Sequence, residues 1–247
     1  MPVKIIYKDK KITVCEKAPG MLTQSDIGGE PGLTELLCSQ LGVEQVYPVH
    51  RLDRPVGGLI VFALDSRTCA MLSRQAKPGE DKLSRPLSKA YLAVVSGRPD
   101  PECGEMSDLM YRNPAINKSF IVSGERKGVK RARLEYSLVK TIYLPEGSFT
   151  GGFQGSAESG RQLSLVSITL DTGRTHQIRT QFSYRGMPIA GDGKYGSRIK
   201  TENIALWSHR LVISHPSTGE KMTFVSKPPA SGIWSYFSDE TAENIRY

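Results

Sequence analysis

The chain has 247 residues, of which 38% are hydrophobic, which is ordinary for a soluble globular protein with a sizeable core. Its 33 Lys and Arg outnumber 25 Asp and Glu, and the net charge of +8 favours a polyanionic partner such as nucleic acid. The sequence has no secretory apolar core at its start and no stretch near the roughly 18 apolar residues that span a bilayer. These features argue against export and membrane insertion, and we expect a cytoplasmic protein.

Strands and helices can be predicted in order along the first third of the chain. Apolar runs around a polar turn predict paired strands at residues 3–7 and 12–16. Leucines at helical spacing predict a helix at residues 33–41. Residues 59–64 are short, apolar and partly β-branched, which predicts a buried strand. Ser66 is the expected N-cap of a helix that runs to about residue 75.

The middle of the chain is less regular. Residues 78–81 should break the preceding helix, and a strand is expected at residues 90–95. Residues 99–117 contain scattered Pro and Gly and are predicted to be irregular. A basic cluster at residues 126–133 enters a strand predicted at residues 134–140. Such a cluster is either a solvated edge or an RNA contact, and the sequence leaves both open.

The last part of the chain completes the predicted fold. We expect an exposed hairpin loop at residues 146–160, a half-buried strand at 163–170, a helix at 175–185 and strands at 204–213 and 221–225. We find no internal repeat or linker, so residues 1–247 are expected to form a single domain. Strands and helices without regular βαβ alternation predict an α+β fold on a largely antiparallel mixed sheet with flanking helices and loops.

Cysteine and histidine positions indicate no metal site. The chain has four cysteines: Cys15, Cys38, Cys69 and Cys103. They are far apart and lack metal-ligand spacing, so we expect reduced, mostly buried thiols. The chain has four histidines: His50, His176, His209 and His215. None forms a close i, i+4 pair, so the sequence predicts no metal ion.

Chemistry concentrates in the stretch HRLDR at residues 50–54. Asp53 stands there among two arginines and a histidine, directly before the predicted buried strand. Neighbouring positive charges would keep its carboxylate ionised. An ionised aspartate can act as a nucleophile or a base, or can form a salt bridge that holds a loop. Local chemistry alone favours the salt bridge.

The wider motifs change this interpretation. The stretch HRLDRPVGGLIVFAL at residues 50–64 resembles the catalytic motif of the RluA-type RNA pseudouridine synthases. Other stretches similar to the family follow its order: EKAPGML (16–22), KAYLA (89–93), GRTHQIR (173–179) and GMPIAGDGKYG (186–196). The resemblance spans nearly the whole chain. It departs from the family at Val56-Gly57, where Thr-Ser is usual, and at Glu16, where Asn is usual.

The resemblance implies that the protein isomerises specific uridines of structured RNA, either rRNA or tRNA, after flipping the target base. Asp53 would be the catalytic carboxylate. It would attack C1′, add to the uracil ring or take a proton from C2′, and the sequence does not choose among these. Arg179 would pair with Asp53 and keep it ionised. Tyr91 would lie against the flipped uracil.

Further residues receive supporting roles from the same resemblance. Arg51 would fill the space that the flipped base vacates, and Ile178 would form an apolar wall for the base. Hydrogen bonding that supports the site, more than chemistry, is expected of four residues: His50, Arg54, Arg174 and His176. Without the family match, Arg179 would be interpreted as a surface arginine and Tyr91 as a core aromatic.

The resemblance implies no cofactor, since the isomerisation needs neither a redox equivalent nor a group donor. Residues 191–196 match the dinucleotide pattern G-x-G-x-x-G, but they follow no parallel strand and open no evident helix. The expected partner is RNA, with no membrane and no metal, and we expect a monomer. The family's optional N-terminal S4-type RNA-binding domain is expected to be missing, since the catalytic-domain opening begins at about Val3.

Two other classes of function stay open at this stage. One is a non-catalytic RNA-binding or ribosome-assembly protein on the same scaffold, although a binder needs no Asp53, Tyr91 and Arg179 together. The other is a nucleic-acid hydrolase, which would want carboxylates clustered around metal ions. The sequence does not identify the RNA or the position that is modified.

Overall fold

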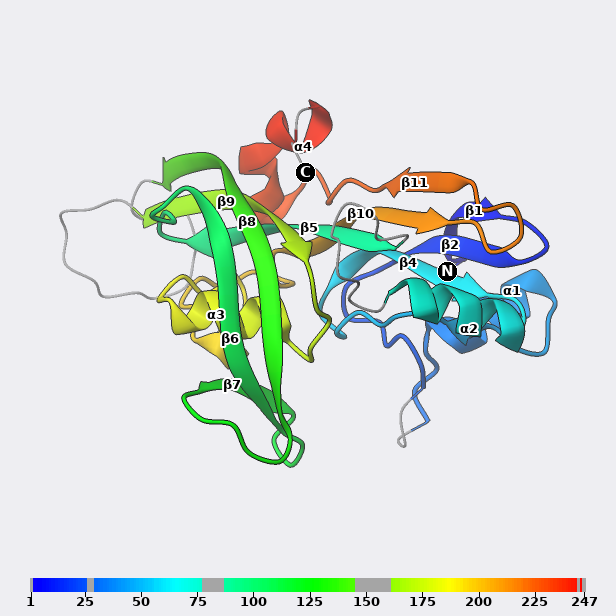
Figure 1. The fold of residues 1–247 in the computed structure, drawn as a ribbon. Coiled ribbons are helices and arrows are strands. Elements are labelled where there is room, and N and C mark those ends of the chain that lie inside the picture. The colour runs from blue at the N-terminus through cyan, green and yellow to red at the C-terminus, as the bar shows by residue number, and fades with distance from the viewer. Residues whose placement is uncertain (1, 26–28, 77–86, 145–160, 244, 246–247) are drawn as a thin grey trace. The chain divides into compact units, whose positions relative to one another are not determined.

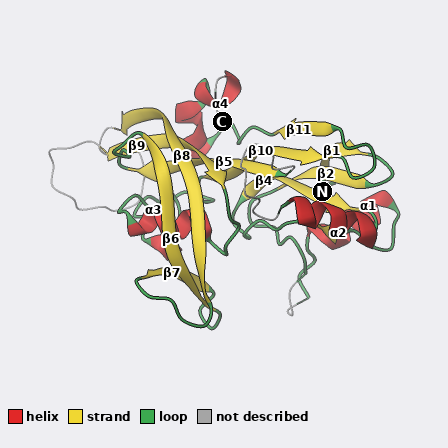
Figure 2. Ribbon diagram, viewed as in Figure 1, coloured by secondary structure: helices red, strands yellow, loops and turns green. Residues whose placement is uncertain are grey.

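The computed structural model describes residues 2–25, 29–76, 87–144, 161–243 and 245. The chain forms two compact units, residues 1–90 with 207–228 and residues 91–206 with 229–247. Figures 1 and 2 show that both are built mainly of strands, with short helices beside them. The predicted α+β class is confirmed, because short helices accompany strands whose described pairings are mostly antiparallel.

In the described part of the first unit, the strands of the sheet are β1 (Lys4–Lys8), β2 (Ile12–Lys17), β3 (Tyr47–Pro48), β4 (Gly57–Ala63), β10 (Leu206–Ser214) and β11 (Lys221–Val225). Their order is β1-β2-β4-β10, with β3 on β4 and β11 on β10. The predicted strands at 3–7, 12–16, 59–64, 204–213 and 221–225 are therefore confirmed with small shifts at their ends. Strand β4 is buried at every position, as its apolar run predicts.

Helices α1 (Leu33–Leu41) and α2 (Ser66–Gln75) also belong to the first unit. The predicted ends of both helices are confirmed, but the cap of α2 is not Ser66. Asp65 caps this helix instead, because its carboxylate accepts a hydrogen bond of 2.7 Å from the Thr68 amide. Leu72 of α2 packs into a core with residues of β2, β4, β10 and β11, so the helix is held by burial of its apolar face.

Two glycines after the HRLDR stretch allow β4 and β10 to approach each other. A Cβ atom on Gly57 would lie 2.2 Å from the Trp207 ring. Gly58 has φ +108°, and a Cβ there would lie 2.3 Å from the Ser208 carbonyl oxygen. Both contacts are shorter than atoms tolerate, and the dihedral of Gly58 strains other residues. In this chain Trp207 occupies the space that a side chain at position 57 would need.

The sheet of the second unit has the order β5-β9-β8-β6-β7. Its strands are β5 (Ser88–Ser96), β6 (Cys103–Asn113), β7 (Lys118–Val122), β8 (Val129–Leu144) and β9 (Arg161–Leu170). The predicted strands at 90–95 and 163–170 are confirmed. Strand β9 is not half-buried, however, since positions 163–168 are all buried. Both of its faces are covered, so the apolar-polar alternation of its sequence does not mark a solvent face.

The prediction of irregular structure at residues 99–117 is wrong. Strand β6 fills most of this range and pairs with β8 from Cys103 opposite Ser137 to Tyr111 opposite Val129. Its sequence is poor in β-branched residues and contains Gly, Asp and Asn, which are depleted in strands. Pairing with neighbouring strands outweighs these weak local preferences. Strand β8 also starts earlier than predicted, so part of the basic cluster at 126–133 lies within it.

Helix α3 (Gln177–Tyr184) confirms the helix predicted at 175–185. It contacts β7 in the second unit (Figure 1). The Gln181 amide donates to the Met106 carbonyl at 3.1 Å and to the Asp108 carboxylate at 2.6 Å. These bonds fix the helix against β6. Three short helical segments follow along the chain: η1 (Gly193–Tyr195), η2 (Gly232–Phe237) and α4 (Glu240–Glu243).

Some predictions fall on residues outside the described ranges, and the prediction about the burial of the cysteines differs from the structure. The helix break at 78–81 and the hairpin loop at 146–160 lie outside the described residues. All four cysteines are free thiols, but only Cys15 is fully buried and Cys103 is exposed, so the expectation of mostly buried thiols is wrong. Among the described helices, none is long and apolar enough to cross a membrane.

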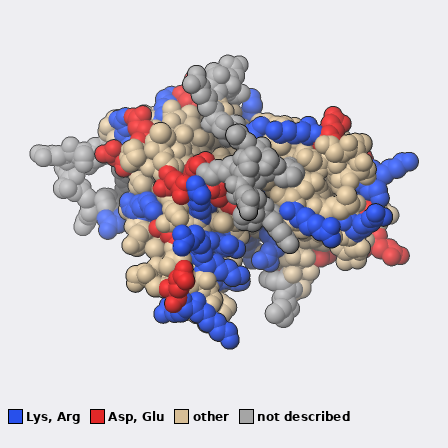
Figure 3. Space-filling view, in the orientation of Figure 1, with Lys and Arg blue, Asp and Glu red and all other residues tan. Residues whose placement is uncertain are grey.

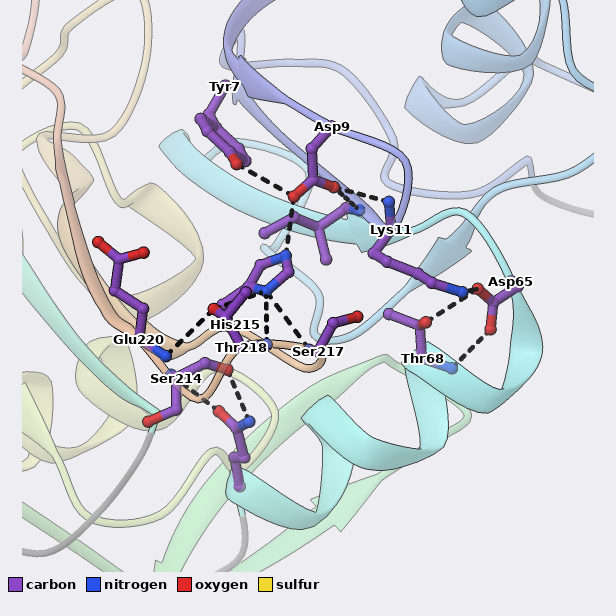
Figure 4. Close-up of polar contacts among 12 residues, drawn as sticks. Tyr7, Asp9, Lys11, Asp65, Thr68, Ser214, His215, Ser217, Thr218 and Glu220 are labelled. Carbon is purple, nitrogen blue, oxygen red and sulfur yellow. Dashed lines mark hydrogen bonds and ion pairs between the residues drawn. The ribbon is translucent and has the colours of Figure 1, made fainter.

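A polar cluster ties the β1–β2 turn to the β10–β11 turn within the first unit (Figure 4). The Asp9 carboxylate accepts hydrogen bonds from the Lys11 and Ile12 amides at 2.6 and 2.8 Å. Its other oxygen accepts from the Tyr7 hydroxyl at 3.0 Å and faces His215 Nε2 at 2.8 Å. Nδ1 of this histidine accepts backbone N–H groups, so the ring proton lies on Nε2 and points at Asp9.

We expect Asp9→Asn to lower the free energy of unfolding at neutral pH by about 1 kcal/mol, a modest loss because Asp9 is partly exposed. Partial burial opposes the charge on Asp9, but the hydrogen bonds from the Ile12 and Lys11 amides, His215 and Tyr7 outweigh it and lower its pKa. A lowered pKa stabilises the fold above the ordinary carboxyl range, and this contribution is lost as pH falls through the lowered value.

The measurement is urea unfolding of both proteins from about pH 7 down to about pH 2. The difference in free energy of unfolding should shrink at the acid end. A difference that stays constant across this range would show that the charge on Asp9 does not contribute.

Candidate active site

The backbone around Asp53 is held by its own turn and by the segment after β2. The Val56 amide donates to the Asp53 carbonyl at 3.0 Å, which closes a turn just before β4. The Thr23 hydroxyl donates to the Leu52 carbonyl at 3.1 Å, and the Leu52 side chain is buried. The Gly20 amide donates to the Arg54 carbonyl at 2.9 Å. Asp53 itself is half-buried, so the loop presents a partly accessible carboxylate on a fixed backbone.

Lys17 at the end of β2 is fully buried and supports the same loop. Its ammonium donates to three carbonyl oxygens: those of Ala18 at 3.1 Å, Met21 at 2.7 Å and Arg54 at 3.0 Å. Burial lowers the pKa of Lys17 to about 7, the negative charge of Asp53 raises it, and Arg54 lowers it. Lys17 therefore joins the turn after β2 to the loop of Asp53, and the negative charge of Asp53 favours its protonated form.

The two arginines beside Asp53 in the sequence have different surroundings. Arg51 is exposed. Arg54 donates through Nε to the Gly20 carbonyl at 3.0 Å and forms an ion pair of 2.9 Å with Glu30. Both contacts of Arg54 hold the backbone and side chains around this loop, and its supporting role in the reaction stays a prediction. Lys17 was given no role by the sequence, although it lies within the family-like stretch at 16–22.

His50 precedes this loop and is held against β4. Its Nε2 accepts a hydrogen bond of 3.4 Å from the Val61 amide, so the ring proton of the neutral form lies on Nδ1. Burial, with a smaller effect of the Lys89 charge, lowers the pKa of His50 well below its ordinary value. Burial also lowers the pKa of Lys89 to about 8. His50 is therefore a neutral imidazole that accepts a strand amide, and its supporting role stays a prediction.

The other predicted site residues lie in the second unit. Tyr91 is buried in β5, and Ile178 is buried in the first turn of α3. Arg174 donates through Nε to the Arg131 carbonyl at 3.0 Å, which ties the segment before α3 to β8. His176 directly precedes α3 with φ 55°, a left-handed conformation that is uncommon for residues other than glycine. Tyr91, Ile178 and Arg174 thus occupy ordered positions on strands and at the start of a helix.

Arg179 is a buried cation on α3 with a carboxylate partner in its own unit. Its Nε and one terminal nitrogen donate to the two oxygens of Asp192 at 2.6 and 2.9 Å. Only 4% of the Arg179 side chain and 1% of the Asp192 side chain are exposed. The two-point geometry fixes the plane of the guanidinium. The sequence did not predict this partner, and the pairing of Arg179 with Asp53 in the other unit stays a prediction.

Tyr195 completes the surroundings of Arg179. The guanidinium carbon lies 4.9 Å from the centroid of the Tyr195 ring. The Tyr195 hydroxyl accepts a hydrogen bond of 2.9 Å from the Ser119 amide and lies 2.9 Å from His176 Nδ1. Asp192 and Tyr195 both lie in the family-like stretch at 186–196, which was the only sequence signal that they belong to the site.

The site as described offers carboxylate, ammonium, guanidinium and aromatic groups, and no cluster of metal ligands. Within the described residues, no group of three or more His, Cys, Asp or Glu side chains is placed to hold a metal ion. The cations near the candidate carboxylate would suit an anionic substrate.

Solved structures show which class of fold this is. A human RNA pseudouridylate synthase domain containing 1 structure matches with a TM-score of 0.68 and 18% sequence identity, over 98% of this chain and 95% of that chain. A human RNA pseudouridylate synthase domain containing 4 structure matches with a TM-score of 0.65 and 20% identity, over 96% and 91% of the two chains. The fold is that of a pseudouridylate synthase domain.

Sequence comparison establishes the family. The family described as RNA pseudouridylate synthase matches residues 11–184. The dual-specificity RNA pseudouridine synthase RluA of Haemophilus influenzae is 31% identical over 90% of this chain and 92% of its own length. The tRNA pseudouridine synthase C of Haemophilus ducreyi is 29% identical over 90% of each chain. The chain belongs to the RNA pseudouridylate synthase family, and it is an RNA pseudouridine synthase of the RluA type.

Proposed function

We propose that this enzyme isomerises specific uridines in structured rRNA or tRNA and that Asp53 is its catalytic carboxylate. The observation that carries the proposal is the support of the Asp53 loop. Hydrogen bonds from Thr23, Lys17 and Gly20 hold the loop against the entrance of a fully buried strand. A catalytic group needs such a rigid support, because a small misplacement costs a large part of the rate.

The reaction would proceed by breaking the bond between C1′ and N1, rotating the uracil and joining C1′ to C5. The C5 proton is then released to water and N1 takes up a proton, so the product is an isomer and no redox partner is consumed. Asp53 would attack C1′, add to the ring or take a proton from C2′. Tyr91 would give the flipped base a flat stacking surface, and Ile178 would add an apolar wall. Arg51, which is exposed, would occupy the space that the base leaves.

Arg179 would keep Asp53 ionised in this scheme. Two hydrogen bonds to Asp192 already fix its guanidinium. No conformational entropy would therefore be lost in orienting this charge during the reaction. His50, Arg54, Arg174 and His176 would hold the surrounding backbone. We further propose that the two units act together as one catalytic domain, that the protein is a monomer and that it acts in the cytoplasm. The names of the relatives, one dual-specificity and one acting on tRNA, support rRNA or tRNA as the substrate class.

The proposal is tested by single-turnover reaction with RNA that carries tritium at C5 of uridine. Release of tritium to water is expected, since isomerisation alone replaces the C5 hydrogen. Pseudouridine mapping of total RNA from cells with and without the protein then identifies the position. Tight binding of the mapped RNA without tritium release would instead favour the non-catalytic RNA-binding alternative.

The basic cluster at 126–133 is the candidate for contact with the phosphate backbone. Lys127, Lys130 and Arg131 are exposed. Figure 3 shows Lys and Arg side chains gathered over the region of β6, β7 and β8. Reversing these three residues to Glu is expected to weaken RNA binding. The slope of log affinity against log salt should become shallower by roughly 0.7 for each phosphate of single-stranded RNA that the variant no longer neutralises.

A charge-matched control separates local contact from net charge. Lys8, Arg67 and Lys221 are exposed in the first unit and can be reversed to Glu in the same way. If the cluster contacts RNA, its variant should bind RNA more weakly than this control at every salt concentration. Equal weakening in the two variants would mean that only net charge matters and that the cluster is a solvated edge.

A further inference from the structure

One short segment holds Arg179 from two sides. Asp192 accepts two hydrogen bonds from one edge of the guanidinium. The centroid of the Tyr195 ring lies 4.9 Å from the guanidinium carbon. These two residues stand three apart, at the start and the end of η1. A carboxylate at the edge fixes the plane of the group, and a ring at its face favours the cation electrostatically. Together they leave the guanidinium little freedom to rotate or tilt.

The segment that carries Asp192 and Tyr195 is itself held in place by hydrogen bonds. The Asp192 carbonyl accepts hydrogen bonds of 3.0 Å from the amides of Tyr195 and Ser197. The Ser183 hydroxyl donates to the Tyr195 carbonyl at 2.6 Å, which ties η1 back to the helix that carries Arg179. Gly191, just before the segment, has φ +83°, and a Cβ there would lie 2.8 Å from the Asn203 carbonyl oxygen. The backbone path therefore requires glycine at that position.

The Tyr195 hydroxyl is fixed as well as its ring. It accepts a hydrogen bond from the Ser119 amide on β7, and it lies within hydrogen-bond distance of Nδ1 of His176, the residue before α3. The Ser119 hydroxyl donates to the Thr175 carbonyl at 2.7 Å. A second cation, the Lys118 ammonium, lies 5.1 Å from the centroid of the same ring. A tyrosine that only filled the core would need neither the two cations at its ring nor the fixed hydroxyl.

We infer that Asp192 and Tyr195 are positioning residues for Arg179, which set the place and plane of its guanidinium for the reaction. The inference rests on the proposed function, in which Arg179 serves the catalytic carboxylate. The action of both residues is indirect, through the arginine. Removing either should therefore lower the rate of the chemical step much more than the affinity for RNA.

The kinetic test compares single-turnover rates at saturating RNA with RNA dissociation constants. Tyr195→Leu removes the ring and is expected to lower the rate about 10-fold to 100-fold while RNA affinity stays close to wild type. Tyr195→Phe keeps the ring and should recover most of the rate. Asp192→Asn keeps the shape of the side chain and should also lower the rate. The control is Tyr184→Leu, because Tyr184 is a 66% exposed tyrosine on α3, the helix that carries Arg179.

Combination with Arg179→Lys shows whether the effect passes through the arginine. In that background the Tyr195→Leu change should cost much less than in the wild type, because the planar group it positions is already gone. Equal fractional losses in both backgrounds, or a wild-type rate in both Tyr195→Leu and Asp192→Asn, would overturn the inference. A purely structural role would lower the melting temperature without this dependence on Arg179.

A measurement without RNA keeps the inference separate from the proposed function. Nitrogen-15 NMR of the free protein reports rotation of the Arg179 guanidinium, with the signal assigned by its loss in Arg179→Lys. Slow rotation is expected in the wild type and faster rotation in Asp192→Asn and Tyr195→Leu. Fast rotation in the wild type would overturn the inference. A wild-type protein that releases no tritium would overturn the proposed function, and the NMR result would still decide the positioning.

Discussion

Replacement of Asp53 by Asn is expected to abolish tritium release, with a loss of at least about 10³-fold in the single-turnover rate. The amide has nearly the same size as the carboxylate, but it cannot act as a base or as a nucleophile of comparable strength. The Thr23 hydroxyl and the Val56 amide donate to backbone carbonyls of the loop, and neither bond uses the Asp53 side chain. Folding and RNA affinity should therefore stay close to wild type.

The experiment needs a control for the loss of one negative charge. Asp239→Asn makes the same change at an exposed position near the end of the chain and should leave the rate unaltered. The melting temperature and the RNA dissociation constant of both variants are measured beside the rate. Appreciable turnover in Asp53→Asn, at an intact melting temperature, would remove Asp53 from the catalytic role.

The second large effect is expected for Arg179, through both stability and activity. Its partner Asp192 is almost fully buried, so Arg179→Ala leaves a carboxylate without its counter-charge. Removing one member of such a pair typically costs about 3–5 kcal/mol in the free energy of unfolding. The double variant Arg179→Ala with Asp192→Asn removes both charges and should recover part of this loss. Chemical unfolding of the two single variants and the double variant measures the coupling.

Activity should respond to pH if Arg179 also keeps Asp53 ionised. Without the guanidinium, the protonated form of Asp53 becomes more favourable, so Arg179→Ala should lose activity at neutral pH and regain part of it as pH rises. Arg179→Lys keeps a positive charge and should retain more activity, although it lacks the planar two-point geometry.

The measurement is the single-turnover rate from about pH 6 to about pH 9. It is made for the wild type, Arg179→Ala, Arg179→Lys and the double variant Arg179→Ala with Asp192→Asn. The double variant separates the two effects, because it is expected to recover part of the stability without recovering activity. Rates like those of the wild type in Arg179→Ala across this range would show that Arg179 does not serve Asp53. Arg174 would then be the next candidate partner.

Most of the elements could be predicted because their signals are local. The run at 59–64 is apolar at every position and forms the buried strand β4. The leucine spacing at 33–41 matches α1 at both ends. Strand β6 could not be predicted in this way, since its residues have weak strand preferences and its structure depends on pairing with β8, which follows it by many residues. Helix α2 was predicted with the wrong cap because Asp65 and Ser66 are both common N-cap residues.

The same distinction holds for the candidate site: short motifs predicted its main residues, but not the contacts between separate segments. Ordered motifs predicted the family, and the motif positions gave Asp53, Tyr91 and Arg179 as candidates for catalysis. No spacing rule could show that Lys17 spans from β2 to the Arg54 carbonyl, or that Asp192 and Tyr195 hold Arg179. These contacts depend on where separate segments meet after folding.

The sequence by itself therefore determined the family, the α+β class and the identity of the candidate carboxylate, since each depends on residue type and order within short stretches. The tertiary structure alone decided which groups surround that carboxylate loop and the arginine. Lys17 supports the Asp53 loop because the pairing of β2 with β4 brings its side-chain nitrogen to the Arg54 carbonyl. Asp192 is the partner of Arg179 because the backbone turn at Gly191 brings η1 back onto α3. Hydrogen bonding and charge pairing act only between groups that folding has brought this close together.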